Sequence, residues 1–246
     1  MNSQKNLNAI DESMVEEISA ALDRAENDAE AKVVVLKGLP RAFSAGGDIG
    51  FFYDLINSGQ DVNMDSLVIK VEALADKMKR MKKLIITSVA GAVAGAGVSL
   101  AISGDFMICA DNAKFMLAFV NLGLVPDTGA VYLLTKSLGA ARTMELAITG
   151  RPMKAQEAYD TGLACKLTTP EELSDVTMQF ARKLTAGPLL SYENIKKQVY
   201  YAAYRDYKEW MKETEMPTQQ TVAASEDFKE GCRAFMEKRK PQFTGK

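Results

Sequence analysis

The uncharged segment from Leu84 to Gly104 constrains the fold more than any other part of this sequence. Its first half is rich in β-branched residues and predicts a buried strand. Its second half is rich in glycine and serine and predicts a tight turn that leads into a buried helix. The segment is nearly long enough to cross a bilayer. Because the mean hydropathy of the chain is low and buried cores contain such runs, we expect a core segment and no membrane span.

The composition is that of an ordinary globular protein with a large core. The chain has 246 residues, of which 47% are hydrophobic and 25% charged, and its net charge is −2. No block of basic residues suggests a nucleic-acid partner. The N-terminus lacks the apolar core of a signal peptide, and Cys109, Cys165 and Cys232 show no CxxC spacing. We therefore expect a cytoplasmic protein whose cysteines are reduced and buried.

Strand-like and helical patterns alternate along the first part of the chain. This order predicts a layered α/β core built from successive turns of one spiral. We assign residues 1–186 to this core and residues 187–246 to a C-terminal helical region. Strands are expected at 32–37, 84–90, 105–110, 114–117 and 164–167, with a loop at 41–50. Helices are expected at 11–27, 51–56 and 68–81, in a segment that ends at 103, and at 128–138, 140–149, 154–160, 170–186, 190–213 and 218–238.

The chain contains no histidine. This excludes Ser-His-Asp and Cys-His catalysis, histidine-ligated zinc and acid–base chemistry by an imidazole. Any chemistry must come from carboxylates, hydroxyl groups, lysines or the backbone, and we expect neither a metal site nor a separate cofactor.

Two glycine-containing segments, residues 43–48 and 91–99, each follow a predicted buried strand or end one. Glycine allows backbone N–H groups to approach a ligand closely, and two such groups converging on one carbonyl oxygen would form an oxyanion hole. Neither segment completes a P-loop or a GxGxxG motif. Each segment by itself is more typical of a turn that permits close packing.

Asp127 follows twelve uncharged residues, Phe115 to Pro126. Apolar surroundings destabilise an ionised carboxylate, so the pKa of Asp127 is expected to rise into the range of a general base. The same residue is well placed to cap a helix that begins at Thr128. Both interpretations stay open at this point.

Four segments, in this order along nearly the whole chain, resemble the enoyl-CoA hydratase/isomerase (crotonase) family. They are Ala42-Phe-Ser-Ala-Gly-Gly-Asp-Ile49, residues 91–105, residues 115–129 and Thr149-Gly-Arg-Pro-Met-Lys-Ala-Gln-Glu-Ala158. The resemblance implies a spiral of ββα units, a C-terminal helical region that trimerises, and a coenzyme A thioester as substrate. By position, it places the oxyanion-hole N–H groups on Ala45 and Ala96. The substrate-binding residues that it implies are Ala42, Phe43, Ala45, Gly46, Gly47, Asp48, Ile49, Gly95, Ala96 and Phe119.

The departures from the family pattern indicate which reaction to expect. Hydratases of the family carry two glutamates, at positions that match Ser99 and Phe119 here. A phenylalanine cannot activate water, so hydration by the usual carboxylate pair is not expected. Asp127 falls where carboxylate-dependent enoyl-CoA isomerases of the family carry their acid. The resemblance therefore implies a Δ3 to Δ2 enoyl-CoA isomerase in which Asp127 moves one proton, with no need for histidine.

Other interpretations stay open at the level of sequence. The chain could catalyse other acyl-CoA chemistry, or it could be a non-catalytic acyl-CoA-binding protein; a dehalogenase-like nucleophilic Asp127 is disfavoured because that enzyme also needs histidine. Family members usually carry two strands ahead of the Asn6-Leu-Asn-Ala run, so another element is expected to cover that edge of the core unless the numbered chain is shortened. The assembly is expected to be a homotrimer or a hexamer. The carrier of the acyl group, CoA or acyl carrier protein, is not determined.

Several further residues receive structural interpretations. Asp48 is expected to hold the first glycine loop by hydrogen bonds to the backbone, and Ser99 to pack or bond back within its helix. The aromatic-rich stretch from Tyr192 to Trp210 favours core or subunit packing over base stacking. The basic residues 238–240 either end the chain in solvent or contact CoA phosphates, and residues 57–65 are expected to shape the acyl pocket.

Overall fold

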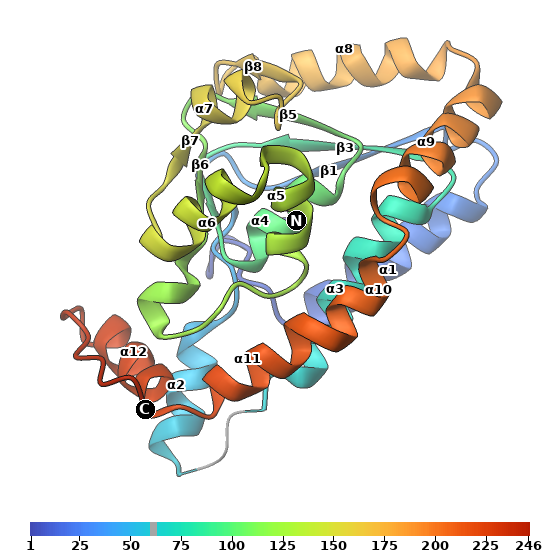
Figure 1. The fold of residues 1–246 in the computed structure, drawn as a ribbon. Helices are drawn as coiled ribbons and strands as arrows, with labels where there is room; N and C mark the ends of the chain where they lie inside the picture. The colour runs from blue at the N-terminus through green and yellow to red at the C-terminus, as the bar shows by residue number, and fades with distance from the viewer. Residues whose placement is uncertain (60–62) are drawn as a thin grey trace.

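Two four-stranded sheets, joined strand by strand along the chain, form the centre of the molecule (Figure 1). The computed structural model describes residues 1–59 and 63–246. The strands in these ranges are β1 (Val33–Lys37), β2 (Ala42–Ser44), β3 (Leu84–Val89), β4 (Ala92–Ala94), β5 (Phe106–Ala110), β6 (Lys114–Met116), β7 (Met153–Lys154) and β8 (Lys166–Thr168). One sheet has the order β1-β3-β5-β8 and is parallel. The other has the order β2-β4-β6-β7, and its β6–β7 pair is antiparallel.

The first six strands alternate between the two sheets, which is the geometry of a spiral. Each turn of the spiral adds one strand to each sheet, so β1, β3 and β5 are neighbours in one sheet and β2, β4 and β6 in the other. The sharp bend from β3 into β4 depends on Gly91, whose φ is +65°. A Cβ at this position would lie 2.0 Å from the carbonyl oxygen of Arg41, so only glycine fits. The predicted α/β spiral is confirmed.

Helices cover the sheets and extend the core. Those of the described residues are α1 (Glu12–Asn27), α2 (Ile49–Asn57), α3 (Asp65–Arg80), α4 (Ala96–Ser103), η1 (Ala118–Leu122), α5 (Ala130–Leu138), α6 (Ala140–Thr149), α7 (Ala155–Asp160), α8 (Leu173–Thr185), α9 (Leu189–Ala203), α10 (Tyr207–Trp210), η2 (Met211–Glu215), α11 (Met216–Ala223) and α12 (Glu226–Met236). Helix α8 packs across β1, β3 and β5. Helix α4, fully buried, packs between the second sheet and helices α3 and α5.

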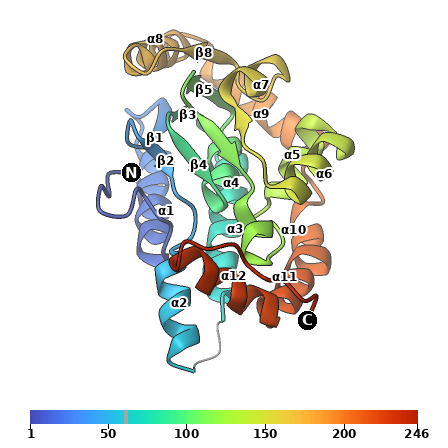
Figure 2. The ribbon, with the colours of Figure 1, turned by 90° about the vertical axis from the view of Figure 1, so that its left-hand side faces the viewer.

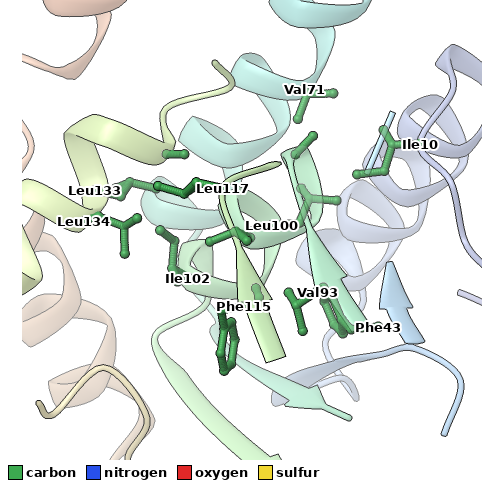
Figure 3. Close-up of a cluster of buried hydrophobic side chains, with 14 of the residues drawn as sticks. Ile10, Phe43, Val71, Val93, Leu100, Ile102, Phe115, Leu117, Leu133 and Leu134 are labelled. Carbon is green, nitrogen blue, oxygen red and sulfur yellow. The ribbon is translucent and has the colours of Figure 1, made fainter. Parts of the chain in front are cut away.

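The largest apolar cluster lies around α4 and the second sheet (Figure 3). Phe43, Val93 and Phe115, one from each of β2, β4 and β6, are at most 2% exposed and contact the apolar side chains of α4. The prediction that residues 84–104 form the centre of the core is confirmed, because β3, β4 and α4 all derive from this segment. Within the described residues, no helix is both long and apolar enough to span a bilayer.

The C-terminal region differs from the two long helices that the pattern predicted at 190–213 and 218–238. Helix α9 ends at Ala203, and a new helical run begins at Tyr207 and continues through a π-helical turn, η2, into α11. This run lies along α3 at the edge of the molecule, whereas α12 folds back and packs against α2 and η1 (Figure 2). The helices end where the chain changes its packing partners, because each short helix buries a different set of side chains. Trimerisation through this region stays a prediction.

Helices α5 and α8 also begin later than expected, at Ala130 and at Leu173. Before α8, the backbone N–H of Glu172 donates to Thr169 Oγ1, while Thr169 Oγ1 donates to the Glu172 carboxylate. This reciprocal pair holds a turn ahead of the helix, so the predicted capping residues act three residues before its start.

Residues 7–10 lie along the free edge of β2. The backbone N–H of Ile10 donates to the carbonyl oxygen of Gly46 at 2.7 Å, and Ser44 Oγ donates to the carbonyl oxygen of Asn8 at 2.7 Å. Asn8 itself is fully buried and donates from Nδ2 to the carbonyl oxygen of Phe43 at 3.0 Å. Residues 7–10 therefore cover this edge of β2.

The cysteines do not all behave as predicted. Cys109 and Cys232 are buried free thiols, but Cys165 is exposed. Cys165 stands directly before β8, whose strand pairs only with β5 at the edge of its sheet, and this leaves the side chain in solvent. The expectation of burial was wrong for this residue.

Candidate active site

A cavity of about 270 Å³ lies between the two glycine loops, helices α2 and α3, η1 and the segment before α5. Its walls are apolar, with side chains such as Phe52, Val71 and Leu122. Among the described residues that line it, Asp127 is the only ionisable one. The cavity therefore suits an apolar chain that meets a single carboxylate.

The two glycine loops meet at one end of this cavity. A Cβ added to Gly95 would lie 3.6 Å from the Cα of Gly46, and a Cβ added to Gly46 would lie 2.9 Å from the carbonyl oxygen of Ala94. Both residues have positive φ values, +89° for Gly46 and +51° for Gly95. Side chains would push the loops apart, so the glycines are what allows them to converge.

Ala96 supplies one backbone donor at this junction. It is the first residue of α4, Gly95 provides no side-chain cap, and within the described residues the N–H of Ala96 has no hydrogen-bond acceptor. The positive end of the helix dipole adds to the field at this N–H group. Ala96 lines the cavity, and its role as an oxyanion-hole donor stays a prediction.

Ala45 does not have the role that was expected of it. Its N–H donates to the carbonyl oxygen of Leu7 at 3.0 Å, because residues 7–10 pair with this edge of β2. The neighbouring Gly46 N–H is also engaged, with Ser44 Oγ at 3.1 Å. In the part of the chain that the structure describes, the N–H of Gly47 donates to no such acceptor, and Gly47 lines the cavity. The available donor of this loop is therefore Gly47.

The other predicted binding residues divide into two groups. Ile49, Gly95 and Phe119 line the cavity, together with the loop residues already described. Ala42 and Phe43 do not reach it: both are fully buried in the core, because they belong to the central part of β2. Asp48 also lies outside the lining and instead caps α2, accepting a hydrogen bond from the Phe51 N–H. Of the segment 57–65, Met64 lines the cavity, and residues 60–62 lie outside the described residues.

Asp127 is 6% exposed and does not cap a helix, since α5 begins three residues later with Gly129 as its N-cap. Its Oδ2 atom accepts a hydrogen bond from Gln219 Nε2 at 2.8 Å. Burial raises the pKa of Asp127 to about 7, and the negative charge of Glu72 adds to the effect. The interpretation as a general base thus agrees with the geometry, whereas the capping interpretation was wrong.

The backbone after Asp127 adopts an uncommon conformation. Thr128 has a φ of +58°, which is rare for a β-branched residue, and Gly129 has a φ of +82°. Ser99 is fully buried, as one of its two expected roles requires. Its Oγ lies 2.7 Å from Thr128 Oγ1, so it bonds to this turn and not within its own helix. The turn places the Asp127 carboxylate at the cavity and its neighbour Thr128 beside α4.

Three polar residues that the sequence analysis did not identify lie near this turn. They are Glu72, Glu215 and Gln219. Glu215 is 2% exposed and accepts a hydrogen bond from the Gly129 N–H at 2.9 Å. Burial raises the pKa of Glu215 to about 10 and that of Glu72 to about 7. Gln219 is also 2% exposed. The spacing along the helix could have identified two of them. Every fourth residue from Tyr207 is buried, first Tyr207 and Met211 and then Glu215 and Gln219.

Metal binding has no support from clustered ligands. In the ranges 1–59 and 63–246, no three Cys, Asp or Glu side chains come close enough together to hold an ion. Of the basic residues 238–240, Arg239 is paired to Glu230 and Glu237.

Comparisons with known proteins agree with the geometry. A model of the family described as enoyl-CoA hydratase/isomerase matches residues 1–246. A trans-2-decenoyl-[acyl-carrier-protein] isomerase from Streptococcus mutans is 35% identical over 94% of this chain and 88% of its own length. A 1,2-epoxyphenylacetyl-CoA isomerase from Escherichia coli is 34% identical over 100% of this chain and 94% of its own. Among solved structures, an enoyl-CoA hydratase from Mycobacterium avium subsp. paratuberculosis superposes with a TM-score of 0.89 at 29% identity, covering 99% of this chain and 93% of that one.

Proposed function

Because the chain belongs to the enoyl-CoA hydratase/isomerase family, we propose that it isomerises an enoyl thioester. The carbon–carbon double bond moves from the C3–C4 position to the C2–C3 position, next to the thioester. The observation that carries the proposal is that a single carboxylate, Asp127, stands in an otherwise apolar cavity that ends at two converging glycine loops. The family relationship supports an acyl-CoA-type substrate, and the cavity supports an apolar acyl group.

The reaction needs few protein groups. In the first step, the ionised Asp127 takes a proton from C2, and the C2–H electron pair forms a dienolate whose negative charge rests on the thioester oxygen. The N–H groups of Gly47 and Ala96 are placed to stabilise this oxygen, a contribution of several kcal/mol for a pair of preorganised donors. In the second step, Asp127 returns the same proton to C4, which leaves the double bond at C2. No water, metal or redox cofactor takes part.

The surroundings of Asp127 favour isomerisation over hydration. Hydration needs groups that hold and activate a water molecule, and the two positions where hydratases carry glutamates are Ser99 and Phe119 here. Phe119 is an apolar wall of the cavity, and Ser99 Oγ is bonded to Thr128. Two similar relatives are named as isomerases, one acting on an acyl-carrier-protein thioester and one on a CoA thioester, which supports the reaction type and makes both carriers candidates.

The deciding experiment is a spectrophotometric assay of the purified protein with 3-enoyl thioesters. Formation of the conjugated 2-enoyl thioester is followed in the ultraviolet, with short, medium and cyclic acyl groups on CoA and on acyl carrier protein. In parallel, 2-enoyl-CoA is supplied and hydration is detected as formation of the 3-hydroxyacyl thioester by its gain of one water in mass, because loss of conjugation alone would also follow from isomerisation to the 3-enoyl thioester. Conjugation without hydration supports the proposal. Binding of the thioesters without any conversion would favour a non-catalytic acyl-CoA-binding protein, and rapid hydration would contradict the proposal outright.

A further inference from the structure

We propose that Gln219 and Glu215, one helical turn apart at the start of α11, are positioning residues that fix the carboxylate of Asp127 for proton transfer. The inference rests on the proposed function in that it gives Asp127 the role of proton carrier. Both residues come from the C-terminal helical region, 88 and 92 positions after the acid that they hold.

Gln219 defines which oxygen of Asp127 is available. Its Nε2 donates to Asp127 Oδ2 at 2.8 Å, and the side chain is 2% exposed. Its other polar atom, Oε1, has no donor among the described residues, so within these residues the hydrogen bond to Asp127 is the only one that this buried amide makes. A buried amide is costly unless it is hydrogen-bonded. Because Oδ2 is held, Oδ1 is left as the oxygen that takes and returns the substrate proton.

Glu215 holds the backbone that carries the acid. Its carboxyl oxygens lie 2.9 and 3.2 Å from the N–H of Gly129, the second residue after Asp127. The turn between them includes Thr128 at φ +58°, a conformation that persists only where the surroundings fix it. Glu215 from one side and the Ser99–Thr128 contact from the other provide that restraint. Without it, the turn would relax toward commoner φ values and withdraw the carboxylate from the cavity.

The helix itself is adapted to this contact. The π-helical turn η2 ends at Glu215, directly before α11. Such turns widen a helix locally and occur frequently at functional sites. Here Glu215 is the last residue of the wider turn and Gln219 lies one helical turn after it, and the two contact Gly129 and Asp127.

The contact is tested with Gln219→Met, which keeps the side-chain length but removes the donor. The matched control is Gln220→Met, at the next position of the same helix, where the side chain is exposed. The second variant, Gln219→Asn, keeps the amide group but shortens the side chain by one methylene, which draws the donor away from Asp127. It replaces the methionine variant if that variant does not fold. The first readout is the titration of the Asp127 carboxyl, followed by NMR of protein labelled with ¹³C-aspartate and assigned with Asp127→Asn.

Loss of the donor removes a hydrogen bond to the ionised form, so the titration of Asp127 should move to higher pH by about one unit in both Gln219 variants and not in Gln220→Met. With a 3-enoyl thioester, kcat at pH 7 should fall about tenfold or more while KM stays within about twofold. An unchanged titration and unchanged kcat would overturn the inference. The titration needs no substrate. If the wild-type protein failed to isomerise, the proposed function would be refuted, and the titration would still show whether Gln219 acts on the Asp127 carboxyl.

Discussion

The N–H of Ala45 donates to the carbonyl oxygen of Leu7 at 3.0 Å, and this bond decides which residue of the first glycine loop can receive a thioester oxygen. Ala45 and Gly46 are both engaged, so Gly47 is the cavity-lining residue of this loop whose N–H has no acceptor among the described residues, as is Ala96 in the second loop. The covering of one strand edge by residues 7–10 thus shapes the active site as well as the core.

Removing the Gly47 donor should cost most of the activity. Gly47→Pro lacks the N–H group, and we expect kcat for isomerisation to fall by about 10²- to 10³-fold. Gly47→Ala keeps the donor and is the matched control, since a Cβ there would meet only a ring atom of Phe52 at 3.7 Å. Initial rates with a 3-enoyl thioester measure both. Equal activity of the two variants would show that the thioester oxygen binds elsewhere.

Asp127→Asn should abolish isomerisation and spare ligand binding. The amide cannot accept the C2 proton, and a positioned general base contributes roughly 10²- to 10⁴-fold. Binding of a saturated acyl-CoA, measured by calorimetry, should be preserved because the cavity keeps its shape. Asp48→Asn is the control, since Asp48 caps α2 outside the cavity lining. Retention of turnover in Asp127→Asn would rule out Asp127 as the proton carrier.

The rate should depend on pH through Asp127. Because burial raises the pKa of this acid to about 7 and the ionised form is the base, kcat should rise with pH through a midpoint near 7. Glu72→Gln removes the nearby negative charge, so the midpoint should move to lower pH by about half a unit. Asp76→Asn, one turn along α3, is the control variant. A midpoint that stays in place in Glu72→Gln would contradict the electrostatic link between the two carboxyls.

Glu215 should make the protein less stable as pH rises. Burial raises the folded-state pKa of Glu215 to about 10 from an ordinary value of 4.5. Between these values the unfolded chain has lost the proton and the folded chain has kept it, so stability falls with rising pH. Glu215→Gln keeps an acceptor for the Gly129 N–H and cannot ionise. It should match wild type near pH 4 and exceed it by several kcal/mol at pH 8, because each pH unit between the two pKa values costs about 1.4 kcal/mol.

Urea unfolding at the two pH values measures this difference. Glu213→Gln, two residues earlier and exposed, is the matched control and should follow wild type at both. If Glu215→Gln kept the pH dependence of wild type, the proton would not reside on Glu215.

Much of the fold could be read from local patterns. The buried strands and the helix α4 follow from uncharged, β-branched and glycine-containing runs, because such sequences have few alternatives to burial. Asp127 and Ala96 could also be assigned, since a lone acid after an apolar run and a glycine loop before a helix are both visible along the chain. Helix boundaries in the C-terminal region could not, because α9, η2, α11 and α12 end where their packing partners change.

The sequence by itself determined the spiral α/β core, the apolar character of the site and the presence of one carboxylate after an apolar run, because these follow from residues that are neighbours in the chain. Only the tertiary structure decided that Leu7 occupies the N–H of Ala45 and that Glu215 and Gln219 hold the Asp127 turn. The sequence pattern around a polar helix residue is the same whether its side chain faces water or a buried acid. The hydrogen-bond partner of a backbone N–H leaves no signal in the sequence. What packs opposite each group settles its role, and that is fixed only when distant segments meet.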